Sequence, residues 1–148
     1  MSDFDYIIYT DGAGTGNPGF EGWAAIIFNK SSGQKSKKTG CEIETTNNRM
    51  ELIAIIQALE SIPKESSLQI FTDSKYVING IELWIKKWKT NDWIGSNKKK
   101  VKNKDLWMKL DKLSSQFQIT WNWVKGHSGN KYNEEVDRLA RDQINLLH

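Results

Sequence analysis

Short apolar runs separated by turn-forming residues predict strands in the first third of the chain. Residues 6–10 are β-branched and aromatic, which predicts a buried strand that ends at Asp11-Gly12. We expect a second strand near residues 23–28 and a third over about residues 37–44. The turn signal at residues 31–33 indicates that these two strands form a hairpin.

Helical spacing of apolar positions begins in the next segment. An apolar stripe over residues 52–59 predicts an amphipathic helix, with candidate N-caps at residues 45–48 and Pro63 beyond its end. Residues 68–72 predict a fourth strand that stops at Asp73, and the alternation over residues 118–124 predicts a fifth.

Three further helices are expected around the fifth strand. Residues 74–88 have a helical pattern with a candidate break at Gly80, and residues 106–113 and about 132–146 form two more helical patterns. A hairpin-rich first half followed by strands joined through helices predicts an α/β fold: a mixed sheet with helices on both faces.

Composition narrows the class of protein. A chain of 148 residues can bury a core without disulfides, and we expect one catalytic domain over residues 1–148. The chain has 21 Lys and Arg residues and 18 Asp and Glu residues, so its net charge is 21 − 18 = +3. Because this net charge is small, the distribution of charge matters more than its sum. Cys41 is the only cysteine, which excludes an intrachain disulfide and a cysteine zinc site and favours a reducing compartment. With no signal-peptide pattern and no apolar run of membrane-spanning length, we expect a cytoplasmic protein without membrane contact.

Four acidic residues occupy positions that suit a site. Asp11 and Asp73 follow apolar strands, where α/β folds commonly place their sites. Glu51 opens the first helix, and Asp137 lies in the first turns of the last one, ten residues after His127 on a glycine-rich loop. Oxygen ligands without a cysteine or histidine cluster favour Mg²⁺ or Mn²⁺ over zinc. Each acid taken alone is more typical of a turn or a helix cap than of a metal site, and periodicity does not show that the four converge.

Five segments resemble the type 1 ribonucleases H of bacteria and eukaryotes. They follow the family's order from about residue 6 to residue 142: TDGAGTGNPGFEGW, TTNNRMEL, DSKYVINGI, VKNKDLW and WVKGHSGNKYNEEVDRLAR. The resemblance implies a ribonuclease H-like fold with a five-stranded mixed sheet flanked by helices on both faces. It also implies hydrolysis of the RNA strand of RNA–DNA hybrids, leaving 5′-phosphate and 3′-hydroxyl ends.

The same resemblance implies roles for the acids and the histidine. Asp11 and Asp73 would be the central ligands of two Mg²⁺ ions, for which Mn²⁺ can substitute. Glu51 would bind one ion beside a 2′-hydroxyl, and Asp137 would complete the shell of the other. His127 would assist proton transfer or product departure.

Substrate contacts are expected in two regions. The turn over residues 12–19 lets the main chain approach a substrate closely, and asparagine amides can donate to and accept from a 2′-hydroxyl. The resemblance implies that these residues line the minor groove of the hybrid. A basic stretch from Lys86 to Lys104 with interleaved tryptophans suits phosphates and sugars, and the resemblance implies a protrusion here that grips the DNA strand. The expected substrate-binding residues are Gly12, Asn17, Thr46, Asn47, Asn48, Lys75, Trp84, Lys87, Trp88, Lys89 and Asn103. Trp84 and Trp88, at i and i+4, are also expected to pack against each other.

Two residues depart from the family's pattern. The resemblance implies a DNA-phosphate pocket, which Thr46 and Asn103 still match. Glu44 stands near this pocket where relatives often have a basic residue, so a carboxylate there should weaken phosphate binding. Lys75 replaces a usual amide and is expected either to contact an RNA phosphate or to perturb the site.

Two other functions compete with this interpretation. Another nuclease of the same fold, such as a junction resolvase or an integrase-like core, is disfavoured by the GNPG and TNNRMEL segments. A non-catalytic hybrid-binding module is disfavoured by the four acids, because a pure binder has no need of clustered like charges. We expect a monomer with no obligatory protein partner.

Overall fold

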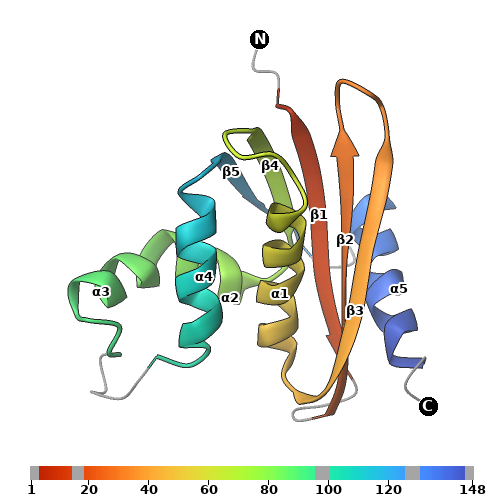
Figure 1. The fold of residues 1–148 in the computed structure, drawn as a ribbon. Helices are drawn as coiled ribbons and strands as arrows, with labels where there is room; N and C mark the ends of the chain where they lie inside the picture. The colour runs from red at the N-terminus through yellow and green to blue at the C-terminus, as the bar shows by residue number, and fades with distance from the viewer. Residues whose placement is uncertain (1–3, 15–18, 96–100, 126–130, 146–148) are drawn as a thin grey trace.

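The computed structural model describes residues 4–14, 19–95, 101–125 and 131–145. These residues form five strands and the helices that connect or follow them (Figure 1). The elements are β1 (Tyr6–Gly14), β2 (Gly19–Asn29), β3 (Lys35–Thr45), α1 (Asn47–Glu60), β4 (Ser67–Thr72), α2 (Lys75–Asn79), η1 (Gly80–Trp84), α3 (Ile85–Thr90), α4 (Lys104–Ser114), β5 (Gln118–Trp123) and α5 (Lys131–Asn145).

The strands form one mixed sheet in the order β3-β2-β1-β4-β5. β1 pairs antiparallel with β2, and β2 pairs antiparallel with β3, as the hairpin signal predicted. β1 and β4 are parallel neighbours, and β4 and β5 are parallel as well. The mixed five-stranded sheet that the sequence predicted is confirmed.

Helices cover both faces of this sheet, which is the predicted arrangement. α5 lies on one face, whereas α1 and α4 lie on the other (Figure 1). Side chains alternate along β1 accordingly: Ile8 belongs to the core beneath α1 and α4, and Tyr9 belongs to the core beneath α5. Each face of the sheet is therefore closed by its own hydrophobic cluster.

One boundary near the site differs from the prediction, and another agrees with it. β1 continues past Asp11-Gly12 to Gly14, because β2 extends far enough to pair with it there (Gly14 opposite Glu21). α1 begins at Asn47, as one of the candidate N-caps predicted: the Thr46 hydroxyl accepts the Arg49 N–H at 3.3 Å and caps the helix. Glu51 consequently lies inside the second turn of α1 rather than at its start.

The predicted break at Gly80 is present as one turn of π-helix between α2 and α3. Gly80 faces the fully buried ring of Trp107 on α4 so closely that a Cβ there would lie 2.0 Å from Cη2 of the indole. Beyond this contact the chain leads away from the sheet and forms an outlying segment, residues 80–95, which we call the protrusion (Figure 1).

The sheet order decides where the acidic residues meet. Because β1 and β4 are adjacent and parallel, Asp11 near the end of β1 and Asp73 just after β4 lie at the same end of the sheet. No helix in the described part of the chain is both long enough and apolar enough to cross a membrane.

Candidate active site

A pocket of about 350 Å³ opens at this end of the sheet. All four predicted metal ligands line it: Asp11, Glu51, Asp73 and Asp137. They come from β1, α1, the segment after β4, and α5, so helices from opposite faces of the sheet contribute to one site. The structure thus brings together residues that lie 126 positions apart in the sequence, between Asp11 and Asp137.

Close packing between β1 and α1 places Glu51 beside Asp11. A Cβ on Gly12 would lie 3.0 Å from Cβ of Met50 and 3.1 Å from the backbone nitrogen of Glu51. Only a residue without a side chain fits there without displacing its neighbours. The Gly12 backbone also interacts with the Glu51 carboxylate by a hydrogen bond.

Burial and mutual repulsion favour the protonated form of two of these acids. Burial, followed by the charge of Asp73 and by interactions with Asp137, raises the pKa of Asp11 from 3.8 to about 9. Burial, followed by the charges of Asp11 and Asp73, raises the pKa of Glu51 well above its usual range, and the Gly12 hydrogen bond offsets this only in part. Without a bound cation these two carboxyl groups therefore favour binding a proton, and a cation would neutralise them in its place.

The donor set fits a hard divalent cation. Carboxylate oxygens of Asp11, Glu51 and Asp73 all lie within 4.8 Å of one another. Glu51 is only 3 % exposed, and its Oε1 has no hydrogen-bond partner within the described residues, so one buried oxygen is available as a ligand. Asp137 interacts with Asp11 and forms an ion pair with Arg141 at 2.8 Å. Oxygen ligands of this kind suit Mg²⁺ or Mn²⁺.

Four of the expected substrate-binding residues line the same pocket as the acids: Gly12, Asn47, Asn48 and Lys75. Two candidates, Asn17 and His127, lie outside the described residues, as does the side chain of Glu44.

Thr46 and Asn103, the two residues expected at a phosphate pocket, both contact Arg49. Its backbone N–H donates to the Thr46 hydroxyl, and its guanidinium donates to Oδ1 of Asn103 at 3.1 Å. The guanidinium also pairs with both oxygens of Asp105, which lowers the pKa of that carboxyl. Asn103 in turn donates from Nδ2 to the hydroxyl of Tyr76, a residue that lines the acidic pocket. Sequence reasoning missed Arg49 and Tyr76, although both lie inside the motifs quoted above.

The protrusion contains a second group of expected contacts. Trp84, Lys87 and Trp88 line a separate pocket of about 530 Å³. The rings of Trp84 and Trp88 lie 5.9 Å apart between centroids, so the expected packing between them is confirmed. Lys89 instead forms an ion pair with Asp111 on α4 at 3.3 Å.

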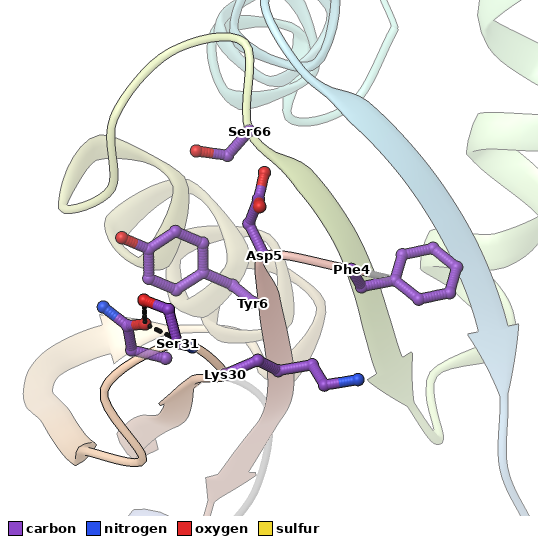
Figure 2. Close-up of a pocket in the computed structure, with 7 residues that line it drawn as sticks. Phe4, Asp5, Tyr6, Lys30, Ser31 and Ser66 are labelled. Atoms are coloured by element: carbon purple, nitrogen blue, oxygen red, sulfur yellow. Dashed lines mark hydrogen bonds between the residues drawn. The ribbon is translucent and has the colours of Figure 1, made fainter. Parts of the chain in front are cut away.

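Another pocket, of about 450 Å³, lies at the opposite end of β1 (Figure 2). Phe4, Asp5 and Lys30 are among its lining residues. Asp5 is already engaged there, since its carboxylate accepts the Ser67 backbone N–H at 2.9 Å. One carboxylate with a structural partner does not form a catalytic group, so this pocket is not the candidate active site.

Comparison with known proteins agrees with the geometry of the acidic pocket. The RNase H family model matches residues 3–145. This chain belongs to the ribonuclease H family. It is 53 % identical over 144 residues to a ribonuclease H of Wolbachia pipientis wMel, covering 97 % of this chain and 98 % of that protein. It is 51 % identical over 138 residues to a ribonuclease H of Francisella philomiragia, covering 93 % of this chain and 90 % of that protein.

A solved structure shows the same fold. The crystal structure of LC9-RNase H1, a type 1 RNase H with the type 2 active-site motif, superposes with a TM-score of 0.84 at 23 % identity. The match covers 100 % of this chain and 75 % of that chain. The family resemblance and the fold expected from it are therefore confirmed, and with them the enzyme class: a ribonuclease H, which cuts the RNA strand of RNA–DNA hybrids.

Proposed function

We propose that this ribonuclease H works with two Mg²⁺ ions bound by Asp11, Glu51, Asp73 and Asp137, with Mn²⁺ as a substitute, and leaves 5′-phosphate and 3′-hydroxyl ends. The observation that supports this best is the convergence of the four acids on one pocket, with three of them within 4.8 Å of one another. Three buried or half-buried carboxylates that close repel one another strongly without a cation.

The acidic residues have different positions and roles in the proposed site. When bound, a pair of divalent cations supplies charge neutralisation at the scissile phosphate and an acidified water. Asp11 and Asp73, from the adjacent strands β1 and β4, hold the centre of the site, and Glu51 and Asp137 flank it from helices on opposite faces. Because each carboxylate is fixed by a different packed element, the ligand geometry is formed before substrate arrives. We propose that His127 assists proton transfer or product departure.

Selection of the RNA strand is proposed to depend on the polar rim of the pocket. Asn47 and Asn48, in the first turn of α1, line the pocket beside Glu51, and their amides can both donate to and accept from a 2′-hydroxyl. Gly12 lets the backbone approach closely, and Asn17 is proposed to extend this surface.

Binding of the DNA strand is proposed to involve two further surfaces. One is formed by Thr46 and Asn103, both held by Arg49. The other is the protrusion, where Trp84, Lys87, Trp88 and Lys89 combine aromatic rings with positive charge.

The hybrid is proposed to be the only partner that the enzyme requires. We propose that it acts as a monomer in the cytoplasm, and its single cysteine is consistent with a reducing compartment. Light scattering of the purified protein with and without hybrid checks the monomer.

Cleavage of an end-labelled RNA–DNA hybrid tests the proposed function. The reactions contain Mg²⁺ or Mn²⁺, and single-stranded RNA, duplex RNA and duplex DNA serve as competing substrates. We expect cuts in the RNA strand of the hybrid alone, and no cuts with Asp73→Asn. An intact hybrid under both metals would contradict catalysis, and cleavage of duplex DNA would favour a resolvase-like nuclease.

A further inference from the structure

Two side chains next to Asp73 have no part in the proposed metal site: Lys75 at the start of α2 and Trp123 at the end of β5. We infer that Trp123 is a positioning residue, which holds the Lys75 ammonium at the acidic pocket so that it binds a phosphate of the RNA strand near the cleaved bond. This inference rests on the proposed function, because it assigns the RNA strand to the pocket that Lys75 lines.

The register of β5 places Trp123 beside the site. β5 pairs parallel with β4, with Trp123 opposite Thr72, the residue before Asp73. Alternation puts Trp121 and Trp123 on the same face, where Trp121 packs against the core beneath α1 and α4. Trp123 lies two residues further along β5 and is 43 % exposed. Its Nε1–H donates to the backbone oxygen of Asp73 at 3.2 Å. This bond fixes the ring against the segment that supplies a proposed metal ligand.

The face of the same ring lies under Lys75. Its ammonium nitrogen is 5.1 Å from the centroid of the Trp123 ring, within the range of a cation–π interaction. Lys75 is exposed and lines the acidic pocket, yet it forms no ion pair with a carboxylate in the part of the chain that the structure describes. Its charge is therefore available to a ligand.

An ammonium in this place suits a phosphate oxygen. Lysine is a compact point charge with three donors, which binds phosphate without needing a fixed planar geometry. Its long side chain loses rotamer freedom on binding, and an aromatic ring that already restricts it reduces that loss. Carboxylates line the centre of the pocket, where the phosphate at the cleaved bond is proposed to bind. We therefore expect the ammonium to bind a neighbouring phosphate of the same RNA strand.

If Trp123 acts by positioning Lys75, substitutions of these two residues should have non-additive effects on KM. We would compare wild type with Lys75→Met, Trp123→Leu, Trp123→Phe and the Lys75→Met/Trp123→Leu double variant, measuring kcat, KM and the salt dependence of KM on one hybrid. Lys64→Met serves as the charge control, because Lys64 is exposed in the loop before β4, at the far end of the sheet. Thermal unfolding of each variant shows that it is folded.

We expect Lys75→Met to raise KM about fivefold, to change kcat less than about twofold, and to lower the slope of log KM against log salt by about 1. Trp123→Leu should raise KM about threefold, since an exposed cation–π contact contributes on that scale. Trp123→Phe keeps a ring beneath the ammonium but lacks the Nε1–H donor to Asp73, so its KM should lie between those of wild type and Trp123→Leu. The double variant should match Lys75→Met alone.

Three results would overturn the inference while leaving the proposed function intact: unchanged KM in Lys75→Met, a raised KM with an unchanged salt slope, or multiplicative effects in the double variant. The second would indicate a contact with an uncharged group such as a 2′-hydroxyl or a base edge. If the wild-type enzyme fails to cut the hybrid, both proposals fall together.

Discussion

Asp11 and Asp73 lie at the same end of two adjacent parallel strands, with carboxylate oxygens within 4.8 Å of each other. Like charges this close, one of them in a residue only 3 % exposed, oppose folding until a proton or a cation neutralises them. The site that is proposed to bind metal is therefore also a source of instability in the metal-free protein.

Neutralising one of these acids should stabilise the metal-free protein. We expect Asp11→Asn to raise its melting temperature by about 2–8 °C, equivalent to about 1–2 kcal/mol, because the amide keeps the shape of the side chain without its charge. Cleavage of the hybrid should fall by a factor on the order of 10³ or more. Calorimetry in EDTA and a cleavage assay measure the two effects. Asp142→Asn, an exposed change on α5, is the control and should alter neither much. A less stable Asp11→Asn protein would contradict the proposed repulsion.

Metal affinity should increase with pH. In the folded metal-free protein the pKa of Asp11 is about 9, against an ordinary value of 3.8, so folding takes up a proton between these limits. The contribution of Asp11 to the stability of the metal-free protein should consequently fall as pH rises through this window and level off above about 9.

A cation must displace the same proton, so its apparent Kd should decrease by up to about tenfold per pH unit for each proton released. Titration calorimetry with Mg²⁺ at pH 6.5, 7.5 and 8.5, in buffers of different ionisation enthalpy, counts the protons directly. A metal affinity that does not change with pH would show that the site is already ionised.

Gly80 should tolerate no side chain. A Cβ at this position would lie 2.0 Å from Cη2 of Trp107, which is fully buried, so Gly80→Ala must displace either the indole or the π-helical turn. We expect a loss of about 1–3 kcal/mol in the free energy of unfolding, together with a raised KM, because the protrusion begins at this turn. Gly33→Ala is a useful comparison, since it has open space but a φ of +74°, so its cost is backbone strain alone. Urea unfolding that shows Gly80→Ala to be as stable as wild type would refute the packing argument.

The Tyr76 hydroxyl connects the acidic pocket to the proposed phosphate pocket. It accepts hydrogen bonds from Nδ2 of Asn103 at 3.0 Å and from Nε1 of the buried Trp107 at 2.9 Å. Tyr76→Phe leaves the indole donor without a partner, which should cost about 1–3 kcal/mol of stability, and it releases Asn103, which should raise KM more than it lowers kcat. Tyr6→Phe is the matched control, because the Tyr6 hydroxyl has no hydrogen bond to the residues that the structure describes. Equal effects of the two substitutions on KM would show that Asn103 is not part of the surface that binds the hybrid.

Local patterns in the sequence predicted all five strands, the helices and the break at Gly80. This succeeded because alternation and helical spacing reflect which side chains must be buried, and the motifs around Asp11, Glu51, Asp73 and Asp137 identified the candidate ligands by chemical type. Boundaries were less accurate: β1 extends to Gly14 only because β2 pairs with it, and pairing depends on a partner strand rather than on local propensity.

The distances between the four acids, and the electrostatic interactions that follow from them, depend on the tertiary structure alone. The parallel pairing of β1 with β4, and the packing of α1 and α5 on opposite faces, bring four carboxylates from distant segments around one pocket. The raised pKa of Asp11 follows from burial and from charges that are remote in sequence, so no local pattern contains it. The contacts of Trp123 with the Asp73 backbone and with Lys75 have the same origin. The sequence determines which side chains are present and which face of each element is apolar, whereas distances between charges, and hence the electrostatics of the site, exist only once the sheet has formed.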